Sequence, residues 1–397
     1  MLSFADELAQ RLADLREQGL HRELRRVDSA GGPRIEIAGQ ALLNFSSNDY
    51  LGLANHPALK QAATTAVAKF GAGAGASRLI CGSLAPFHEL EEALAAFKRT
   101  EAALTFSTGF AAALGAITAL MGRDDIIILD RLVHACMVDA ARLSGAKLRV
   151  FAHNDLNDLE EKLKWAASAS RRPSPATRRV LILTESIFSM DGDAAPLREI
   201  AALKAQYGAW LMVDEAHATG ILGEKGRGLA DALGVSSQIE IRMGTLGKAL
   251  GASGGFICGS RALVDYLVNR ARSFIFSTAP VPAAAGAALA GVNLVQSPEG
   301  ETRRAQLHHR VAELNSAISD RPAPVSCAVI PLLVGDEAKA VAVAARLREQ
   351  GCFVPAIRYP TVARGSARLR ITLSAAHTSE DLSKLTRALC GIANRQP

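Results

Sequence analysis

The chain has 397 residues, of which 49% are hydrophobic and 21% charged, an ordinary composition for a soluble protein with a large core. The net charge is only +6, aromatic residues make up 5%, and arginine and lysine do not cluster with aromatics, so nucleic-acid binding is not expected. No uninterrupted apolar run reaches the ~18 residues of a membrane-spanning helix, and no signal-peptide core is present, so a membrane protein is not expected either.

The mild positive charge has two explanations, which are drift in composition and an acidic partner such as a phosphate-bearing coenzyme or an acidic carrier protein. The cysteines show no CxxC pair and no metal-ligand spacing, which predicts buried, reduced thiols in a cytoplasmic protein without a metal site. These residues are Cys81, Cys136, Cys258, Cys327, Cys352 and Cys390.

Residues 1–45 begin with an amphipathic helix, whose apolar face includes Phe4 and Leu8, and end in a short strand. Residues 46–289 form the large domain, and from about residue 100 short apolar strands alternate with helices, as in a doubly wound α/β sheet. We predict strands at Ala103–Phe106, Ile126–Leu129, Leu148–Phe151, Val180–Thr184, Trp210–Val213, Ile239–Met243 and Gly255–Cys258. Helices are expected at Ala111–Leu120, Leu156–Ala167, Leu197–Tyr207 and Arg261–Ala271, and a surface loop at Ser168–Arg179.

Residues 290–397 change pattern and predict a smaller α+β domain at the C-terminus. Its expected elements are strands Ala328–Val334, Cys352–Ile357 and Leu369–Leu373 and helices Ala338–Gln350 and Ser379–Ala393. Arg370 lies on the polar face of the last strand, where a guanidinium suits bidentate binding of a carboxylate. An exposed strand arginine explains the same pattern equally well.

The most informative residues follow two neighbouring predicted strands. Lys248 stands in the glycine-rich run of residues 244–251, and Asp214 directly follows the apolar strand Trp210–Val213. Pyridoxal phosphate chemistry needs such a pair, a lysine that binds the cofactor covalently and a carboxylate that keeps the pyridine nitrogen protonated. A solvated lysine and a helix cap are the commoner explanations of each residue alone, but together, on consecutive strand ends, they predict this cofactor.

Residues 214–217, Asp-Glu-Ala-His, also match the magnesium-binding box of one helicase class. Such a protein needs the phosphate loop Gly-x-x-x-x-Gly-Lys-[Ser/Thr] upstream of that box. The only Gly-Lys pair of this chain, Gly247-Lys248, lies downstream and is followed by Ala249. We therefore reject the helicase interpretation.

Open α/β sheets bind ligands beyond the carboxyl ends of their strands, so polar residues at these ends are further candidates. Gly109 precedes a predicted helix whose free N–H groups can bind a phosphate, and Thr245 can offer it a hydroxyl. His134 can stack on a planar cofactor or move a proton, although a lone histidine is more often structural. Ser189 and His217 are placed to reach the phenolic oxygen of the cofactor.

Together these segments resemble those of the α-oxoamine synthases, which are fold-type-I pyridoxal phosphate enzymes. The resemblance covers nearly the whole chain and rests on Asn44–Leu53, Ala74–Gly82, Ser107–Ala112, Phe188–Asp193, Val213–Gly220, Thr245–Gly251 and Ile357–Thr378. It implies an aspartate aminotransferase-like fold, pyridoxal 5'-phosphate as the cofactor, and a homodimer with shared active sites.

The resemblance also implies a role for each candidate residue. Lys248 would bind the cofactor and later remove the Cα proton of the substrate, while Asp214 would pair with the pyridine nitrogen. The other roles are ring stacking for His134, contact with the phenolic oxygen for Ser189 and His217, phosphate binding for Gly109, Phe110 and Thr245, carboxylate binding for Asn48 and Arg370, and contact with the acyl substrate for Arg22 and Thr361. Arg25 or Arg26 can replace Arg22, because that match rests on an ungapped count back from Asn44.

Within the family, the chain is most similar to enzymes of biotin biosynthesis that condense L-alanine with a pimeloyl thioester and release carbon dioxide. The thiol carrier, either coenzyme A or acyl carrier protein, stays open. Tyr359 stands where proline is expected and can alter the acyl tunnel. The alternatives are a relative that joins glycine to acetyl-CoA, a plain aminotransferase, and a non-enzymatic sensor, which would need a DNA-binding domain before Asn44.

Overall fold

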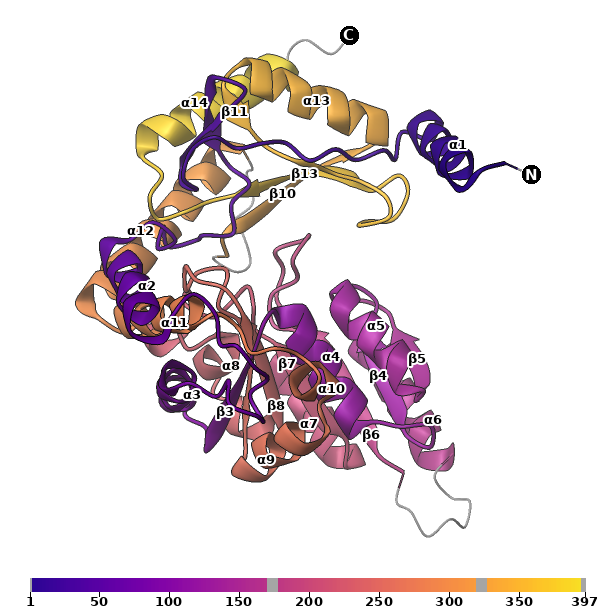
Figure 1. Ribbon diagram of the computed structural model, residues 1–397. Coiled ribbons are helices and arrows are strands. Elements are labelled where there is room, and N and C mark those ends of the chain that lie inside the picture. Colours follow the sequence, from indigo (N-terminus) through magenta and orange to yellow (C-terminus); the bar gives the residue numbers. More distant parts are fainter. Residues whose placement is uncertain (1, 170–177, 319–326, 394–397) are drawn as a thin grey trace.

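The computed structural model describes residues 2–169, 178–318 and 327–393, so most of the expected loop Ser168–Arg179 lies outside the described residues (Figure 1). Its helices are α1 (Phe4–Glu17), α2 (Pro57–Phe70), α3 (Ala85–Lys98), α4 (Gly109–Leu120), α5 (Ala135–Ser144), α6 (Leu156–Ala169), α7 (Leu197–Tyr207), α8 (Leu229–Ala232), α9 (Arg261–Arg270), α10 (Arg272–Ile275), α11 (Pro282–Val295), α12 (Pro298–Ile318), α13 (Glu337–Glu349) and α14 (Ser379–Ala393), with 3₁₀ turns η1 (Glu224–Gly226) and η2 (Ser236–Gln238). Its strands are β1 (Arg34–Ile37), β2 (Gln40–Asn44), β3 (Ala102–Phe106), β4 (Ile126–Asp130), β5 (Lys147–Phe151), β6 (Val180–Glu185), β7 (Trp210–Asp214), β8 (Ile241–Thr245), β9 (Gly255–Gly259), β10 (Val329–Gly335), β11 (Cys352–Phe353), β12 (Ala356–Ile357) and β13 (Ala367–Thr372).

A seven-stranded sheet in the order β3-β9-β8-β7-β6-β4-β5 is the centre of the large part of the molecule. The neighbouring strands from β8 to β5 run parallel, and only β9 is antiparallel to the strands beside it. Most of these strands are apolar and buried along their length, because helices cover the sheet. The predicted doubly wound sheet is therefore confirmed.

The strand predicted at Ile239–Met243 is shifted, because the turn η2 delays the start of β8 to Ile241. The strand predicted at Cys352–Ile357 is wrong as a single element. Its first half, β11, pairs with β2, and its second half, β12, pairs with β13. Pro355 lies between the two halves and has no N–H for a strand ladder, which explains the break.

A smaller sheet, β10-β13-β12, forms the C-terminal part, above the large sheet in Figure 1. The N-terminal segment contains two strands rather than one, and this hairpin, β1-β2, joins β11 in a third sheet beside the C-terminal helices. Helices α11 and α12 connect the two parts, and one continuous apolar cluster reaches from Phe45 and Tyr50 to Leu369. The hairpin β1-β2 and the segment after it thus pack against the C-terminal part of the chain.

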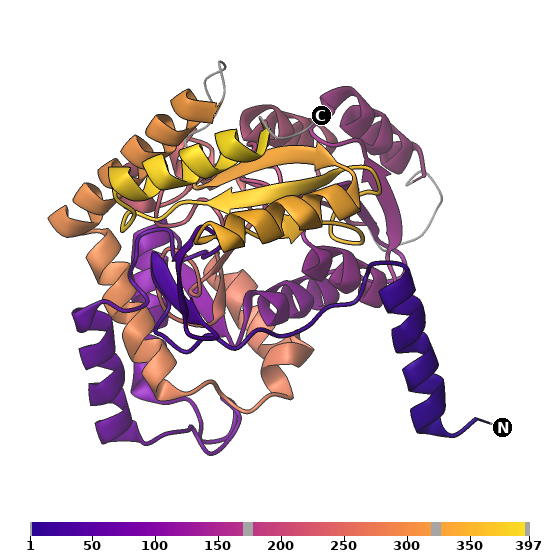
Figure 2. The ribbon, with the colours of Figure 1, turned by 90° about the horizontal axis from the view of Figure 1, so that it is seen from above.

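Helix α1 begins at a capping box, in which Ser3 and Asp6 bond reciprocally, and it buries none of its residues. Figures 1 and 2 show it standing apart from the rest of the molecule. Across the described ranges, we find no helix that combines the length and the apolar character needed to span a bilayer. The prediction of buried cysteines is wrong for Cys81 and Cys390, which are exposed.

Candidate active site

The predicted cofactor-binding residues lie at the carboxyl edge of the large sheet. Pairing places Glu185 of β6 beside Asp214 of β7, and Asp214 beside Met243 of β8. Three residues after β8 ends, Lys248 lies in a turn that Gly251 closes with a bond from its N–H to the Lys248 carbonyl. Gly251 has φ +68°, and a Cβ there would lie 2.6 Å from Leu53 Cβ, so this turn requires glycine.

A chain of hydrogen bonds connects Lys248 with Arg370 of the small C-terminal sheet. Lys248 Nζ lies 2.6 Å from His217 Nε2, and His217 Nδ1 lies 2.5 Å from the hydroxyl of Tyr50. The Tyr50 hydroxyl donates to Asn48 Oδ1 over 3.2 Å, and both terminal nitrogens of Arg370 lie 3.3 Å from the same oxygen. Sequence reasoning missed Tyr50, although it belongs to the segment Asn44–Leu53 that carries part of the resemblance.

The proton positions along this chain follow from the number of donors. Tyr50 has one hydroxyl proton, and it goes to Asn48, so His217 Nδ1–H must donate to the phenol oxygen. His217 Nε2 is then left as an acceptor for an N–H of Lys248. Burial, reinforced by the positive charges of Lys248 and Arg370, lowers the pKa of His217 well below its ordinary value, in agreement with this neutral form.

Burial at the site favours a neutral lysine, and a cationic partner would favour the charged form of the aspartate. Burial lowers the pKa of Lys248, against the opposing effect of the Asp214 and Glu185 carboxylates. Burial raises the pKa of Asp214, and the positive Lys248 opposes this shift. Asp214 accepts the N–H of Ala216 over 2.8 Å and is 6% exposed. A protonated pyridine nitrogen is a fitting additional partner for such a carboxylate.

Glu185 is a second site residue that sequence reasoning missed. It ends β6 next to Asp214, it is fully buried, and its Oε1 has no hydrogen-bond partner within the described residues. Burial and the nearby Asp214 charge raise the pKa of Glu185 well above its ordinary value, so a neutral acid is favoured. The sequence shows Glu185 only as the last residue of an apolar strand. Its role depends on Asp214, which is 29 positions away in the chain but beside it in the sheet.

The phosphate-binding candidates lie close together. Helix α4 begins at Gly109, with Thr108 as its N-cap, and a Cβ at Gly109 would lie 3.9 Å from the Cβ of Thr245. Gly255 of β9 packs directly on this turn, since a Cβ there would lie 2.6 Å from Gly109 N and Cα. A helix N-terminus with a hydroxyl beside it is a suitable anion site. Together with Lys248 and Asp214, these donors fit pyridoxal phosphate.

Gly255→Ala tests this packing. The new Cβ would overlap backbone atoms of Gly109, so the first turn of α4 must move, at a cost of about 1–3 kcal/mol. We expect the affinity for pyridoxal phosphate to fall about tenfold or more, as measured by fluorescence titration of the cofactor-free protein. Gly31→Ala is the matched control, because a Cβ at Gly31 meets nothing within 4 Å. Equal affinities in the two variants would contradict this arrangement.

The carboxylate-binding candidates also meet. Arg370 is 6% exposed, so the interpretation as an exposed strand arginine is wrong. Its Nε donates to the carbonyl of Ser189 over 2.6 Å, and Nη1 also donates to Thr372 Oγ1 over 3.1 Å. Ser189 is itself buried, in the loop after β6. The structure thus brings Asn48, Ser189 and Arg370 together at the junction of the two parts of the molecule.

His134 lies at the N-cap of α5, just beyond β4. Its Nδ1 accepts the N–H of Cys136 over 3.2 Å, and the His134 side chain is partly buried and partly exposed. Burial and the charge of Lys248 lower the pKa of His134, and Asp214 opposes the shift. A neutral ring with an open face can stack on a planar ligand.

The candidates for the acyl substrate lie farther out. Arg22 Nη2 contacts Thr361 Oγ1 at 3.4 Å, and both line a cavity of about 920 Å³ that also includes Arg25 and Arg358. Arg26 does not line this cavity and pairs with Asp28 instead. The contact favours Arg22 or Arg25 over Arg26. Lys248 does not line the cavity, so the single chain does not bring these residues into contact with the lysine.

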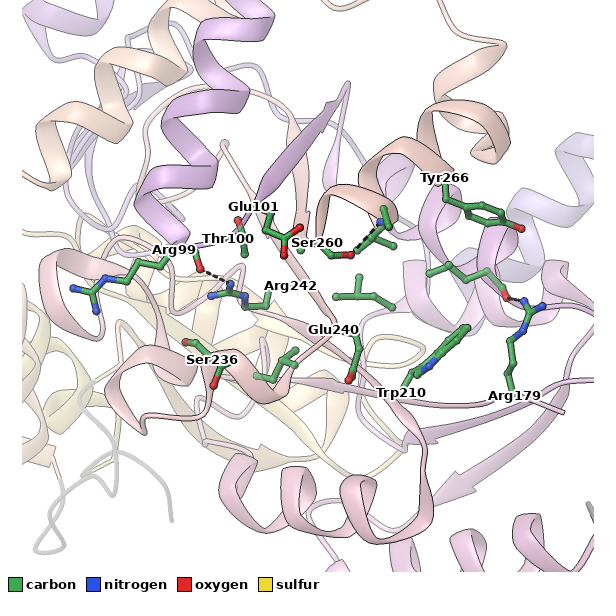
Figure 3. A pocket seen from close by; sticks show the side chains of 17 residues that line it. Arg99, Thr100, Glu101, Arg179, Trp210, Ser236, Glu240, Arg242, Ser260 and Tyr266 are labelled. Atoms are coloured by element: carbon green, nitrogen blue, oxygen red, sulfur yellow. Dashed lines mark hydrogen bonds between the residues drawn. The ribbon is translucent and has the colours of Figure 1, made fainter. Parts of the chain in front are cut away.

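A further cavity, of about 750 Å³, lies at the opposite edge of the large sheet (Figure 3). Trp210, Glu240 and Arg242 line it at or just before the start of their strands, and Tyr266 of α9 lines its margin. None of the predicted site residues belongs to it. Because ligands of such sheets bind beyond the carboxyl ends of the strands, we place the active site at the other edge.

Comparison with known proteins gives consistent matches over the whole chain. Residues 40–389 match the family model "Aminotransferase class I and II". The 8-amino-7-oxononanoate synthase of Geobacter sulfurreducens is 47% identical, with 97% of each chain covered. Serine palmitoyltransferase from S. paucimobilis, solved with a PLP–myriocin adduct, superposes with a TM-score of 0.89 at 27% identity, covering 98% of both chains. The 8-amino-7-oxononanoate synthase of Francisella tularensis gives a TM-score of 0.74 at 27% identity, covering 89% of this chain and 98% of the other.

Proposed function

This chain belongs to the class I and II aminotransferase family, and we propose that it is a pyridoxal 5'-phosphate enzyme that makes 8-amino-7-oxononanoate from L-alanine and a pimeloyl thioester. The reaction joins the alanine Cα to the thioester carbonyl, and it releases the thiol and carbon dioxide. The observation that carries the proposal is the bonded series from Lys248 through His217 to Arg370, which connects a base to a carboxylate-binding group. The full-length match to relatives of this name supports the choice of substrates.

Pyridoxal phosphate, when bound, accepts the electron pair that remains at the substrate Cα when a bond to it breaks. Lys248 Nζ would hold the cofactor, and once the L-alanine amine has replaced it there, the freed Nζ would take the Cα proton, since burial favours its neutral form. His217 orients this amine through Nε2, and Tyr50 fixes the His217 ring in turn. Asp214 would keep the pyridine nitrogen protonated, from a position with little access to water.

Arg370 and Asn48 bind the alanine carboxylate in this proposal. The guanidinium is held on one side by the Ser189 carbonyl, so its position does not depend on the substrate.

In this proposal the cofactor phosphate is bound by Gly109, Phe110 and Thr245. His134 stacks on the cofactor ring, and Ser189 and His217 lie near its phenolic oxygen. Arg22 and Thr361, or Arg25 in place of Arg22, contact the acyl substrate. We also propose a homodimer, in which a partner subunit covers large exposed side chains such as Phe110.

The test of this function is product formation by the purified protein. We expect 8-amino-7-oxononanoate by mass spectrometry when pyridoxal phosphate, L-alanine and pimeloyl-CoA or pimeloyl-carrier protein are supplied. Glycine with acetyl-CoA is the control for the alternative synthase. A pyridoxamine product without thiol release or carbon dioxide would indicate a plain aminotransferase and contradict the proposal.

Arg370→Lys should weaken the binding of L-alanine. A lysine keeps the charge but loses the planar guanidinium that bonds Ser189 and Asn48 together. Since a hydrogen bond to a charged group contributes about 1.5–3 kcal/mol, we expect the KM for L-alanine to rise about 10- to 100-fold, with a smaller change in kcat. Steady-state kinetics measure both values. Arg387→Lys on the exposed side of α14 is the control, and an unchanged KM in Arg370→Lys would remove Arg370 from the substrate site.

A further inference from the structure

His153 bridges two carboxylates from distant parts of the large domain. It lies just after β5, with Nδ1 3.0 Å from Asp130 Oδ1 and Nε2 2.8 Å from Asp193 Oδ2. Asp130 also accepts the N–H of Leu132 and of Asn154, and it is fully buried. A carboxylate that accepts several donors is ionised and can only accept. Each ring nitrogen of His153 thus faces a carboxylate oxygen, and this arrangement favours an imidazolium, which donates from both nitrogens.

The charge of His153 agrees with its surroundings. Burial lowers the pKa of His153, but the hydrogen bonds and the negative charges of Asp130 and Asp193 outweigh burial and raise it to about 10. The rings of Phe188 and His153 meet edge to face, with their centroids 4.4 Å apart. Among the described residues, no group of three or more histidine, cysteine or carboxylate side chains is placed to hold a metal.

The two carboxylates belong to segments that carry site residues. Asp130 ends β4, four positions before His134. Asp193 closes the loop Phe188–Asp193, where the N–H of Phe188 donates to the Asp193 carbonyl over 3.0 Å and the N–H of Gly192 donates to the Phe188 carbonyl over 2.9 Å. This loop contains Ser189, whose carbonyl holds Arg370.

We propose that His153 is a positioning residue, which as an imidazolium between Asp130 and Asp193 fixes the loop Phe188–Asp193, and with it Ser189 and Arg370, against the sheet edge that carries His134. Its effect on the reaction rests on the proposed roles of Ser189 and Arg370. The bridge from Asp130 through His153 to Asp193 exists in the chain without its cofactor, so its effect on the loop can be measured without catalysis.

The first test is the charge of His153 in the cofactor-free protein. Nitrogen-15 NMR of the histidine rings distinguishes an imidazolium from a neutral ring, and the His153→Asn variant identifies the signal. We expect both nitrogens of His153 to stay protonated at about pH 8, where an ordinary histidine is neutral. A neutral His153 ring at that pH would overturn the proposal.

The second test is the order of the loop. In His153→Asn, the shorter amide can replace Nδ1 at Asp130 but cannot reach Asp193. We expect hydrogen exchange at Phe188 and Gly192 to become about tenfold faster in the cofactor-free protein, and the KM for L-alanine to rise more than kcat falls. His56→Asn is the control. His56 lies outside the residues assigned to the site, and its Nε2 contacts Glu299 Oε1 at 3.1 Å. Asp193→Asn removes the charge with little change in shape and serves if His153→Asn does not fold.

Unchanged exchange at Phe188 and Gly192 in a folded variant would overturn the proposal, whatever the activity. If hydrogen exchange accelerates in the variant but the native protein makes no product from any substrate pair, the proposed function fails and the positioning role of His153 stands.

The pH dependence of stability gives a third readout. Since the pKa of His153 is raised from 6.5 to about 10, its contribution is fully present below pH 6.5 and is lost as the pH rises through about 10. The excess unfolding free energy of the native protein over His153→Asn should shrink over this range.

Discussion

Lys248→Ala should lose turnover by a factor on the order of 10⁴ or more, because the variant lacks both the attachment point of the cofactor and the base. Lys248 is the amine that lies 2.6 Å from His217, at the edge of the sheet beside Asp214. The visible absorbance of the covalently bound cofactor should disappear as well. Carbon dioxide release and an absorbance spectrum measure the two effects.

Lys60→Ala is the control for this substitution, since Lys60 lies exposed on α2, outside the residues assigned to the site. It should keep full activity and the absorbance of the bound cofactor. An active Lys248→Ala enzyme, or one whose absorbance is unchanged, would show that another amine binds the cofactor.

Asp214→Asn should lower kcat by a factor on the order of 10²–10³, with the cofactor still attached. The asparagine has nearly the same shape, but at this buried position it cannot become the anion that keeps the pyridine nitrogen protonated. We expect the loss to appear in kcat more than in the KM for L-alanine. Steady-state kinetics and the bound cofactor content measure the outcome.

Asp265→Asn, on the exposed face of α9, is the matched control. A kcat for Asp214→Asn within about twofold of the native value would mean that Asp214 is not the partner of the ring nitrogen. Loss of the cofactor with normal residual activity per bound cofactor would contradict the account in the same way.

The class of fold could be predicted from the sequence, because strands buried on both faces have a near-continuous apolar pattern. The comparisons confirm this prediction. The same pattern placed Asp214 at a strand end, so the position of Asp214 and Lys248 after neighbouring strands could be inferred from chain order. Pyridoxal phosphate as the cofactor agrees with the family and with the solved relative that contains it. The roles of the individual site residues stay predictions until the variants are measured.

What sequence reasoning missed depends on contacts between distant segments. Tyr50 lies 167 positions from His217, and no local pattern distinguishes it from a core tyrosine. His153 likewise meets Asp193 across 40 positions, through a loop whose path the sequence does not determine. The division of the strand predicted at Cys352–Ile357 had a visible local signal in Pro355, but its two partners, β2 and β13, are set by tertiary packing.

The most direct test of the account is the identity of the residue that carries the cofactor. The protein is incubated with pyridoxal phosphate, reduced with borohydride, digested, and its peptides are weighed by mass spectrometry. We predict one stoichiometric adduct, on Lys248, that is absent when L-alanine is in excess at the moment of reduction. An unmodified Lys248 peptide, or an adduct spread over surface lysines, would contradict the assignment of this site.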